Sequence, residues 1–352
     1  MTGDFPDQRA LLRHHGDVDA APGLVDFAVN VQRDQPPAWL LDVLAAELPH
    51  LGRYPSADRD LAARRAVAER HHRSPDEVLV LAGAAEGFAL LPAFGSRLAA
   101  VVHPSFTEPE VALSDAGVHV HRVLLRAEDG YSLRPDLVPA DADLVVVGNP
   151  TNPTSVLHAA DTIRELVRPG RIVVVDEAFL DAVPGEPQSM IGEPGVVVLR
   201  SLTKTWALAG LRAGYAIGEP KILARMARAR PQWPVSSLVL AAVEACSAPA
   251  AVAEAERAAR ELADHRAWLI GQLAELPGVH VHQPADAPFL LLRVPDGPNI
   301  RHALRDKGIA VRRADTFPGL TADHIRIAVR APECCAPLLA ALRAELTEGV
   351  AA

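Results

Sequence analysis

One lysine in this chain lies where covalent chemistry is expected. Lys204 follows the apolar run 196–199 and stands close to two hydroxyl side chains, Ser201 and Thr203. Lysine is rare here, with three residues against a large excess of arginine. A lysine amine forms an imine once its surroundings lower its pKa, whereas arginine stays protonated and does not. Lys204 is therefore a candidate nucleophile, and a surface loop lysine is the alternative interpretation.

A carboxylate and an amide follow two further apolar runs. Asp176 ends the run 172–175, and Asn152 lies in the turn Asn-Pro-Thr-Ser after the run 144–147. Asp176 suits pairing with a cationic ligand group, and the alternative is a helix cap after the strand. The turn around Asn152 is by itself typical of a proline-rich loop. Both residues are thus expected at strand ends.

The elements that would position these residues form a repeating pattern. Apolar runs that read as strands alternate with helical stretches, at 77–81, 99–102, 118–123, 144–147, 171–175, 196–200 and 213–218. Strands that are apolar throughout indicate a mostly parallel sheet covered by helices on both faces, an α/β fold. Ligands of such sheets bind beyond the carboxyl ends of the strands. The candidate residues all follow strands, as this rule requires.

A second, smaller α+β domain is expected after the sheet. The pattern turns helical from 236, and a long helix is predicted over 250–276. Further strands are predicted at 24–30, 279–282, 289–294, 309–312 and 325–329, and further helices at 37–48, 60–71, 300–307 and 333–346. We predict a large domain at 38–249 and a discontinuous small domain made of 1–37 and 250–352.

Composition excludes several classes of partner. The chain has 352 residues, 49% of them hydrophobic, which suffices for a sizeable core, and a net charge of −9, which argues against nucleic acid. No apolar run approaches the ~20 residues of a membrane span, and residues 1–7 lack a signal-peptide pattern. Three cysteines do not make a disulfide framework. We therefore expect a cytoplasmic protein with no metal site, no nucleic-acid partner and no membrane partner.

The lysine segment carries a family resemblance. Ser-x-Thr-Lys, followed by Arg212 within Gly-Leu-Arg-x-Gly-Tyr, resembles the cofactor-lysine motif of the aminotransferase class I/II family of pyridoxal-phosphate enzymes, fold type I. The resemblance implies that Lys204 carries the cofactor and that Ser201, Thr203 and Arg212 hold its phosphate. It also implies that Asp176 pairs with the protonated ring nitrogen, which makes the ring an electron sink.

Other cofactor contacts follow from the same resemblance. Gly83, Ala84 and Ala85 open a helix after a strand, where free N–H groups suit a phosphate. Phe106 matches the family's ring-stacking aromatic, although a plain core position is an equal alternative. These residues complete a binding site for pyridoxal 5'-phosphate.

Two departures and one intersubunit contact stand out. Asn152 resembles the asparagine of Asn-Pro-Thr-Gly that binds the ring oxygen, but Ser155 replaces the usual glycine. Phe179 replaces the usual tyrosine of Asp-Glu-Ala-Tyr, so one donor to that oxygen is missing. Tyr54, before a proline, resembles the tyrosine whose hydroxyl reaches the neighbouring subunit's cofactor phosphate. The alternative is a simple turn tyrosine; the resemblance implies a homodimer with shared active sites.

The resemblance implies four substrate-binding residues: His15, Asn30, Arg312 and Arg326. The two arginines are expected to clamp a substrate carboxylate or phosphate, because a guanidinium binds both anions in bidentate geometry. The neighbouring Arg313 and Arg330 are expected to be solvent-facing strand residues. The resemblance extends from Asn30 to Arg326 in the expected order.

Three functions remain open at this point. Within the family the sequence is most similar to the group of histidinol-phosphate aminotransferases and threonine-phosphate decarboxylases, and His15-Gly16 and Phe179 look most like the decarboxylases of cobalamin synthesis. We favour amino transfer from a small phosphorylated amine, with a 2-oxo acid as a possible second substrate; decarboxylation is the alternative. A ligand-sensing domain is disfavoured, because Lys204 and Asp176 are both present and no DNA-binding extension precedes residue 30.

Overall fold

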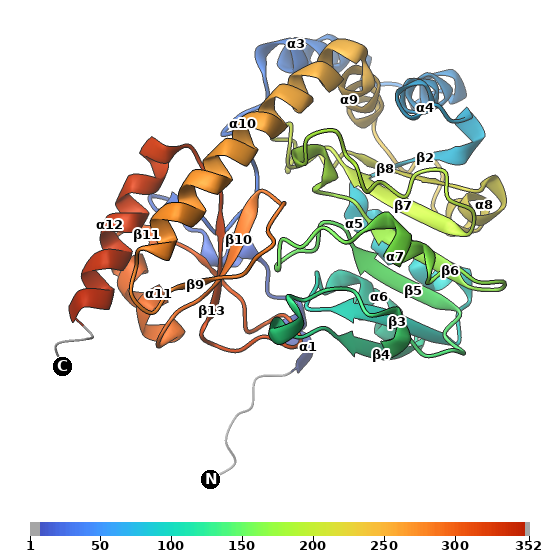
Figure 1. Cartoon of the computed structure of the whole chain (residues 1–352). Coiled ribbons are helices and arrows are strands. Elements are labelled where there is room, and N and C mark those ends of the chain that lie inside the picture. Colours follow the sequence, from blue (N-terminus) through green and yellow to red (C-terminus); the bar gives the residue numbers. More distant parts are fainter. Residues whose placement is uncertain (1–7, 349–352) are drawn as a thin grey trace.

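The computed structural model describes residues 8–348. Residues 1–7, for which no signal peptide is expected, and residues 349–352 lie outside the described residues, and so do both ends of the predicted small domain. Within this range, the main sheet has seven strands in the order β2-β8-β7-β6-β5-β3-β4 (Figure 1). Its strands are β2 (Val78–Leu81), β3 (Leu98–His103), β4 (His119–Leu124), β5 (Leu144–Gly148), β6 (Ile172–Asp176), β7 (Val196–Ser201) and β8 (Gly214–Gly218).

The sheet is mixed but mostly parallel. β8 runs antiparallel to both its neighbours, β2 and β7, and the other pairs are parallel. The central strands are buried on both faces, and every residue of β7 is buried. The edge strand β4 departs from the expected apolar pattern, because only Val123 is fully buried there. The α/β prediction is confirmed, while the expectation of strands that are apolar throughout is wrong at this edge.

Helices cover both faces of the main sheet. α5 (Ala84–Ala89), α6 (Glu108–Asp115) and α8 (Pro220–Arg228) share one apolar cluster with the side chains of one face. α7 (Ala160–Arg164) covers the other face, and α3 (Ala38–Glu47), α4 (Ala57–His71) and α9 (Ser237–Ser247) extend that layer over β2 and β8 (Figure 1). α4 starts before the predicted residue 60, because the Ser56 hydroxyl accepts the Arg59 N–H and caps it. Short 3₁₀ helices lie at 48–50, 75–77, 91–94, 127–129, 135–137 and 180–182.

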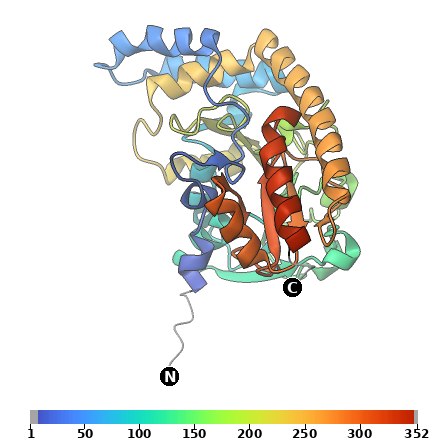
Figure 2. The same cartoon turned by 90° about the vertical axis from the view of Figure 1, so that its left-hand side faces the viewer.

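A second sheet lies in the C-terminal part of the chain. The long helix α10 (Pro249–Ala274) leads from α9 toward this sheet, which has the antiparallel order β12-β13-β10-β9. Its strands are β9 (His280–Val281), β10 (Phe289–Arg293), β12 (Arg312–Arg313) and β13 (His324–Ala328). α10 and α12 (Pro332–Glu348) lie side by side and share an apolar core with these strands and α11 (Gly297–Asp306) (Figure 2).

The N-terminal segment joins this C-terminal part. β1 (Val25–Asp26) pairs in parallel with β11 (Ile309–Ala310), and Phe27 is buried in the same apolar core. Two short helices, α1 (Gln8–Leu12) and α2 (Gly16–Asp19), precede it. The strand predicted over 309–312 is two strands, because the backbone changes partner there and β12 pairs with β13. We propose the domain division 38–249 and 1–37 with 250–352 on this arrangement.

Two features of the described residues concern membranes and metal ions as partners. No single helix within residues 8–348 is long and apolar enough to cross a membrane; α9 and α10 meet that test only as a pair, and they are bent by 72°. In the same range, no group of three or more histidine, cysteine, aspartate or glutamate side chains is placed to hold a metal ion.

Candidate active site

Most of the predicted site residues line one cavity of about 530 Å³. Those that line it are His15, Asn30, Ala84, Ala85, Phe106, Asn152, Asp176, Ser201, Thr203, Lys204, Arg212, Arg312 and Arg326. They come from the carboxyl ends of β6 and β7, the starts of α5 and α6, the N-terminal segment and the second sheet. Gly83 and Tyr54 do not line it, and neither do the alternatives Arg313 and Arg330. Sequence reasoning missed the lining residues Asp17, Phe88, Glu108 and Phe317.

Lys204 lies in the turn that follows β7, and its amine is easily deprotonated. Burial lowers the pKa of Lys204 to about 8, and the charges of Arg326 and Arg212 act in the same direction. Its backbone carbonyl accepts the Gln32 N–H at 3.0 Å, so the N-terminal segment contacts this turn. A lysine with a pKa near 8 is partly neutral at physiological pH, and the neutral amine is the nucleophilic form.

Asp176 ends β6 and carries an unusually weak acid group. Burial raises the pKa of its carboxyl to about 7. Its Oδ1 accepts the Ala178 N–H at 3.1 Å, and its backbone carbonyl accepts the Asn149 N–H at 2.8 Å. The next helical turn starts only at Leu180, so Asp176 closes a local turn rather than capping a helix. A cationic ligand group at this carboxyl would lower that pKa and restore the carboxylate.

A cradle for an anion lies between α5 and the turn after β7. The Ser201 and Thr203 hydroxyls are 2.7 Å apart, and both side chains line the cavity beside Arg212. Gly83, which precedes α5, has φ +77°, and a β-carbon there would lie 3.1 Å from Arg212 Nη2. Glycine therefore provides both the backbone conformation and the space for this guanidinium. Hydroxyls, free N–H groups and one guanidinium are the groups that bind a phosphate.

Arg326 and Asn152 form the opposite wall. Arg326 Nη1 donates to Asn152 Oδ1 at 2.6 Å, and Nη2 donates to the Ala28 carbonyl. Burial lowers the pKa of Arg326, and its Nε has no partner among the described residues. Asn30 Oδ1 is likewise buried without a partner in this part of the chain. Buried polar atoms without partners are rare, so this wall is prepared for a polar ligand.

Arg312 differs from Arg326 because a protein carboxylate, that of Asp19, already pairs with its guanidinium. It donates to the His14 carbonyl at 2.5 Å, to Thr316 Oγ1 at 2.7 Å and to Asp19 Oδ2 at 3.2 Å. It lies opposite Arg326 in the register of β12 and β13. Arg312 thus fastens the N-terminal segment over the cavity, and Arg326 is the better placed of the two to anchor an anion.

His15 and Phe106 meet at the mouth of the cavity. His15 Nε2 lies 2.6 Å from Glu108 Oε1, and this contact lowers the pKa of Glu108. The ring of His15 is 5.2 Å from that of Phe106, with an interplanar angle of 35°. Phe106 is half-buried, lines the cavity and also packs against the apolar core beside it, so both expectations for this residue hold in part.

Three other predicted positions have distinct surroundings. Phe179 lines the cavity and packs edge-on against Phe289, with ring centroids 4.9 Å apart. Tyr54 is 75% exposed and stacks on Trp233 at 4.2 Å, outside the cavity. Its contact with a neighbouring subunit stays a prediction. The expectation that Arg330 is a solvent-facing strand residue is wrong, because it follows β13, is half-buried and donates to the Val29 and Val31 carbonyls.

Arg313, the other residue expected to face solvent, is half-buried as well. Its guanidinium pairs with the carboxylate of Asp315, with Nε donating to Oδ1 at 2.7 Å. Arg313 lies on strand β12 and does not line the cavity. The expectation of a strand residue outside the site is therefore met, although the side chain is only partly exposed and is held in an ion pair.

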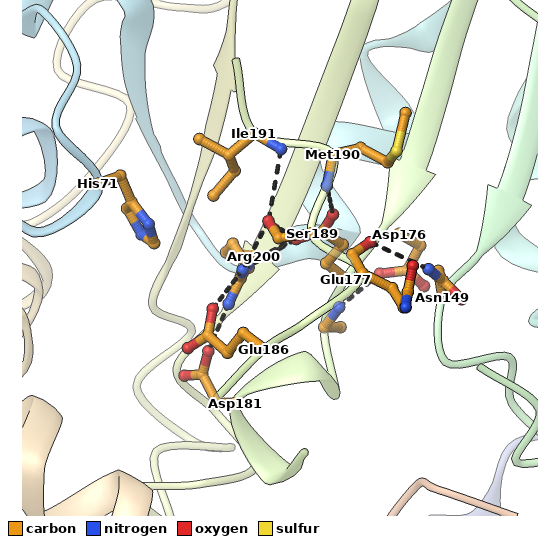
Figure 3. A network of polar contacts seen from close by, with 12 residues as sticks. His71, Asn149, Asp176, Glu177, Asp181, Glu186, Ser189, Met190, Ile191 and Arg200 are labelled. Atoms are coloured by element: carbon orange, nitrogen blue, oxygen red, sulfur yellow. Dashed lines mark hydrogen bonds and ion pairs between the residues drawn. The ribbon is translucent and has the colours of Figure 1, made fainter. Parts of the chain in front are cut away.

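A buried ion-pair network lies directly behind Asp176 (Figure 3). Glu177, the next residue, is 1% exposed; its carboxylate accepts the Arg200 Nε–H at 2.9 Å and the Met190 N–H at 2.6 Å. Arg200 lies on β7, four residues before Lys204. The ion pair therefore ties the end of β6, where Asp176 lies, to the end of β7, which is followed by the turn that carries Lys204.

The network extends from Arg200 to further carboxylates. Arg200 Nη1 donates to Asp181 at 2.7 Å and Nη2 donates to Glu186 at 2.6 Å (Figure 3). Arg70 on α4 donates to the same two carboxylates. Burial acts to lower the pKa of Arg200, but the three carboxylates outweigh it and hold that pKa well above its usual value. Sequence reasoning missed this network, which links residues up to 116 positions apart.

We expect Arg200→Ala to lower the free energy of unfolding by about 3–5 kcal/mol, because it leaves buried carboxylates without their partner. Urea denaturation measures this loss. The control is Arg134→Ala, whose ion pair with Asp136 is exposed and should leave the midpoint unchanged. Equal midpoints for the two variants would contradict a stabilising role of the network.

Comparison with known proteins shows the family to which this chain belongs. The model of the family "Aminotransferase class I and II" matches residues 22–342, and the chain belongs to that family. It is 56% identical to a histidinol-phosphate aminotransferase of Mycobacterium tuberculosis, over 96% of this chain and 91% of that protein. It is 32% identical to the threonine-phosphate decarboxylase of Salmonella typhimurium, over 92% of each. The crystal structure of the histidinol-phosphate aminotransferase from Clostridium acetobutylicum has the same fold, with a TM-score of 0.83, 22% identity and coverage of 91% and 98%.

Proposed function

We propose that this protein is a pyridoxal-phosphate-dependent aminotransferase acting on a small phosphorylated amine, with histidinol phosphate as the leading substrate. The observation that carries the proposal is that Lys204, Asp176, Asn152 and Arg326 all face one cavity. The 56% identity to a histidinol-phosphate aminotransferase supports the choice of substrate. Family membership supports amino transfer as the reaction.

The residues that line the cavity suit the phosphate and the ring nitrogen of the cofactor. Ser201, Thr203 and Arg212 would hold its phosphate, in the space that Gly83 leaves beside the guanidinium. Asp176 would pair with the ring nitrogen, which restores the carboxylate that burial alone disfavours. When bound, pyridoxal 5'-phosphate supplies an electron sink for negative charge at the substrate Cα.

Lys204 has two tasks in this proposal. With a pKa of about 8, its Nζ is available in the neutral form to bond covalently to the cofactor aldehyde. In its free neutral form, Nζ would also be a base that takes a proton from the substrate and returns it. Arg326, which is buried and whose Nε–H has no partner among residues 8–348, would anchor the substrate phosphate and hold the reacting carbon near Lys204.

One observation favours a second candidate, threonine-phosphate decarboxylation. His15 lies at the cavity mouth, held by Glu108, in the N-terminal segment where the sequence most resembles the decarboxylases. The 32% identity to the Salmonella decarboxylase covers 92% of both chains. The weaker identity places this candidate second.

One assay separates the two candidates. The protein loaded with pyridoxal 5'-phosphate is mixed with histidinol phosphate and 2-oxoglutarate, and separately with threonine phosphate. Glutamate formed in the first mixture, without CO₂ from the second, is the expected result. CO₂ from threonine phosphate with no glutamate from histidinol phosphate would mean that the decarboxylase assignment is right.

We also propose a cytoplasmic homodimer with shared active sites. The exposed, stacked pair of Tyr54 and Trp233 supports this, because monomers rarely leave such aromatic surface in water. Arg212, exposed in a single chain, would be covered in a shared site. Sedimentation at micromolar concentration should give twice the 37.5 kDa chain mass. An active monomer would contradict the proposal.

A further inference from the structure

Ser155 occupies a backbone position that favours glycine. Its φ is +68°, in the left-handed region, and the residue is completely buried. The loop around it is closed by two backbone bonds, from Ser155 N–H to the Thr151 carbonyl and from Thr151 N–H to the Val156 carbonyl. A glycine would adopt this conformation without strain, so the serine side chain must offer something that glycine lacks.

That side chain joins two distant parts of the chain. Ser155 Oγ accepts the Ala287 N–H at 2.8 Å, and the Ser155 carbonyl accepts the Asp286 N–H at 2.8 Å. Ala287 is completely buried, so its N–H would be left without a partner if the hydroxyl were absent. The hydroxyl therefore adds a second attachment that the backbone alone does not make.

The two segments that Ser155 joins both contact Arg326. On one side, Asn152 lies in the same loop as Ser155 and accepts Arg326 Nη1 at 2.6 Å. On the other side, Ala287 leads into β10, where the Phe289 ring lies 5.4 Å from the Arg326 guanidinium carbon. The guanidinium is thus held between two segments that Ser155 fastens together.

We propose that Ser155 is a positioning residue, whose hydroxyl fixes the Asn152 loop against β10 and so sets the direction in which Arg326 presents its free N–H groups to an anion. The proposal rests on the proposed function for the identity of the substrate anion. This role gives a reason for a serine at position 155, where the left-handed backbone conformation strains serine more than glycine.

The test compares Ser155→Gly and Ser155→Ala in the cofactor-loaded protein. The glycine variant removes the hydroxyl and the strain, and the alanine variant removes the hydroxyl alone. Both should raise KM for histidinol phosphate about fivefold to tenfold, the effect of one net hydrogen bond, with kcat and the cofactor absorbance spectrum unchanged. Titration calorimetry with inorganic phosphate should show the same loss of affinity.

A matched control is Asp296→Gly. Asp296 also has a positive φ, +48°, and its side chain also accepts a backbone N–H, from Asn299, but it lies on the surface at the start of α11. KM and phosphate affinity should stay at the wild-type values in this variant. The change in its melting temperature measures the effect on stability of losing one side-chain hydrogen bond to a backbone N–H, away from the cavity.

The design distinguishes the two ways of failing. Wild-type KM and phosphate affinity in Ser155→Gly would mean that Ser155 merely fills a backbone position, and the proposal would be overturned. A fall in kcat at constant KM would also overturn it, because the effect would not pass through Arg326. If histidinol phosphate is not turned over at all, the proposed function fails, while the phosphate titration still tests Ser155.

Discussion

Lys204→Ala will reduce the rate of amino transfer by about 10⁴-fold or more and will leave a folded protein that no longer binds the cofactor covalently. The loss combines two functions of one amine, the covalent attachment and the proton transfer. Lys204 lies in the turn after β7, and burial lowers its pKa to about 8. Steady-state kinetics and the near-visible absorbance of the loaded protein measure the two effects separately.

The matched control for this variant is Lys221→Ala. Lys221 is an exposed residue at the start of α8, so its loss should change neither turnover nor absorbance. Circular dichroism shows whether Lys204→Ala keeps its fold. Turnover of Lys204→Ala at the wild-type rate would remove the basis of the functional assignment.

Asp176→Asn will slow the reaction by about 10²–10³-fold while the cofactor remains bound. An amide keeps the shape and the hydrogen bond to Ala178 but cannot supply the negative charge that keeps a ring nitrogen protonated. The variant should therefore lower kcat more than it raises KM, since the ground-state contacts of the substrate do not involve this carboxyl. Rapid mixing with substrate measures the chemical step directly.

Asp143→Asn serves as the control for the second prediction. Asp143 precedes β5 at the opposite end of the sheet, and its carboxylate accepts the backbone N–H groups of Arg97 and Leu98 and pairs with the exposed Arg97 guanidinium at 3.5 Å. Its replacement should leave kcat unchanged. A loss of less than tenfold in Asp176→Asn, or ~1.4 kcal/mol, would mean that Asp176 only closes a turn.

The strand-end residues of the site were predictable from the sequence, for a physical reason. Parallel strands bring their carboxyl ends to one edge of a sheet, so polar residues after successive apolar runs must converge there. Lys204, Asp176 and Asn152 all follow such runs and line one cavity. Their proposed roles in catalysis follow from this convergence and from the family, and the variants above test them.

Contacts that depend on long-range folding could not be predicted in this way. Glu108 meets His15 across 93 positions, and the N-terminal segment binds Arg312, which the sequence suggested as a substrate anchor. Periodicity says nothing about which loops approach one another. The positive φ of Ser155 is of the same kind, because a serine in the sequence does not reveal a left-handed conformation.

One strand prediction, 118–123, is confirmed as β4 without the expected apolar pattern, and another, 309–312, is wrong because it is two strands. β4 forms an edge of the main sheet, so its outward-facing residues include His119, His121 and Arg122 and not a full apolar run. The stretch 309–313 changes partner from β1 to β13, which a pattern of alternating apolar residues cannot show. In both cases the neighbours of the strand, rather than its own sequence, decide its structure.

The most direct test of the account is to find which residue binds the cofactor. The protein loaded with pyridoxal 5'-phosphate is reduced with borohydride, digested, and its peptides are analysed by mass spectrometry. The chain offers only three lysines, Lys204, Lys221 and Lys307, so the assignment is unambiguous. We predict a single reduced cofactor adduct on the peptide that contains Lys204. An adduct on Lys221 or Lys307, or a loaded protein with no adduct, would contradict the central claim that this cavity is the active site.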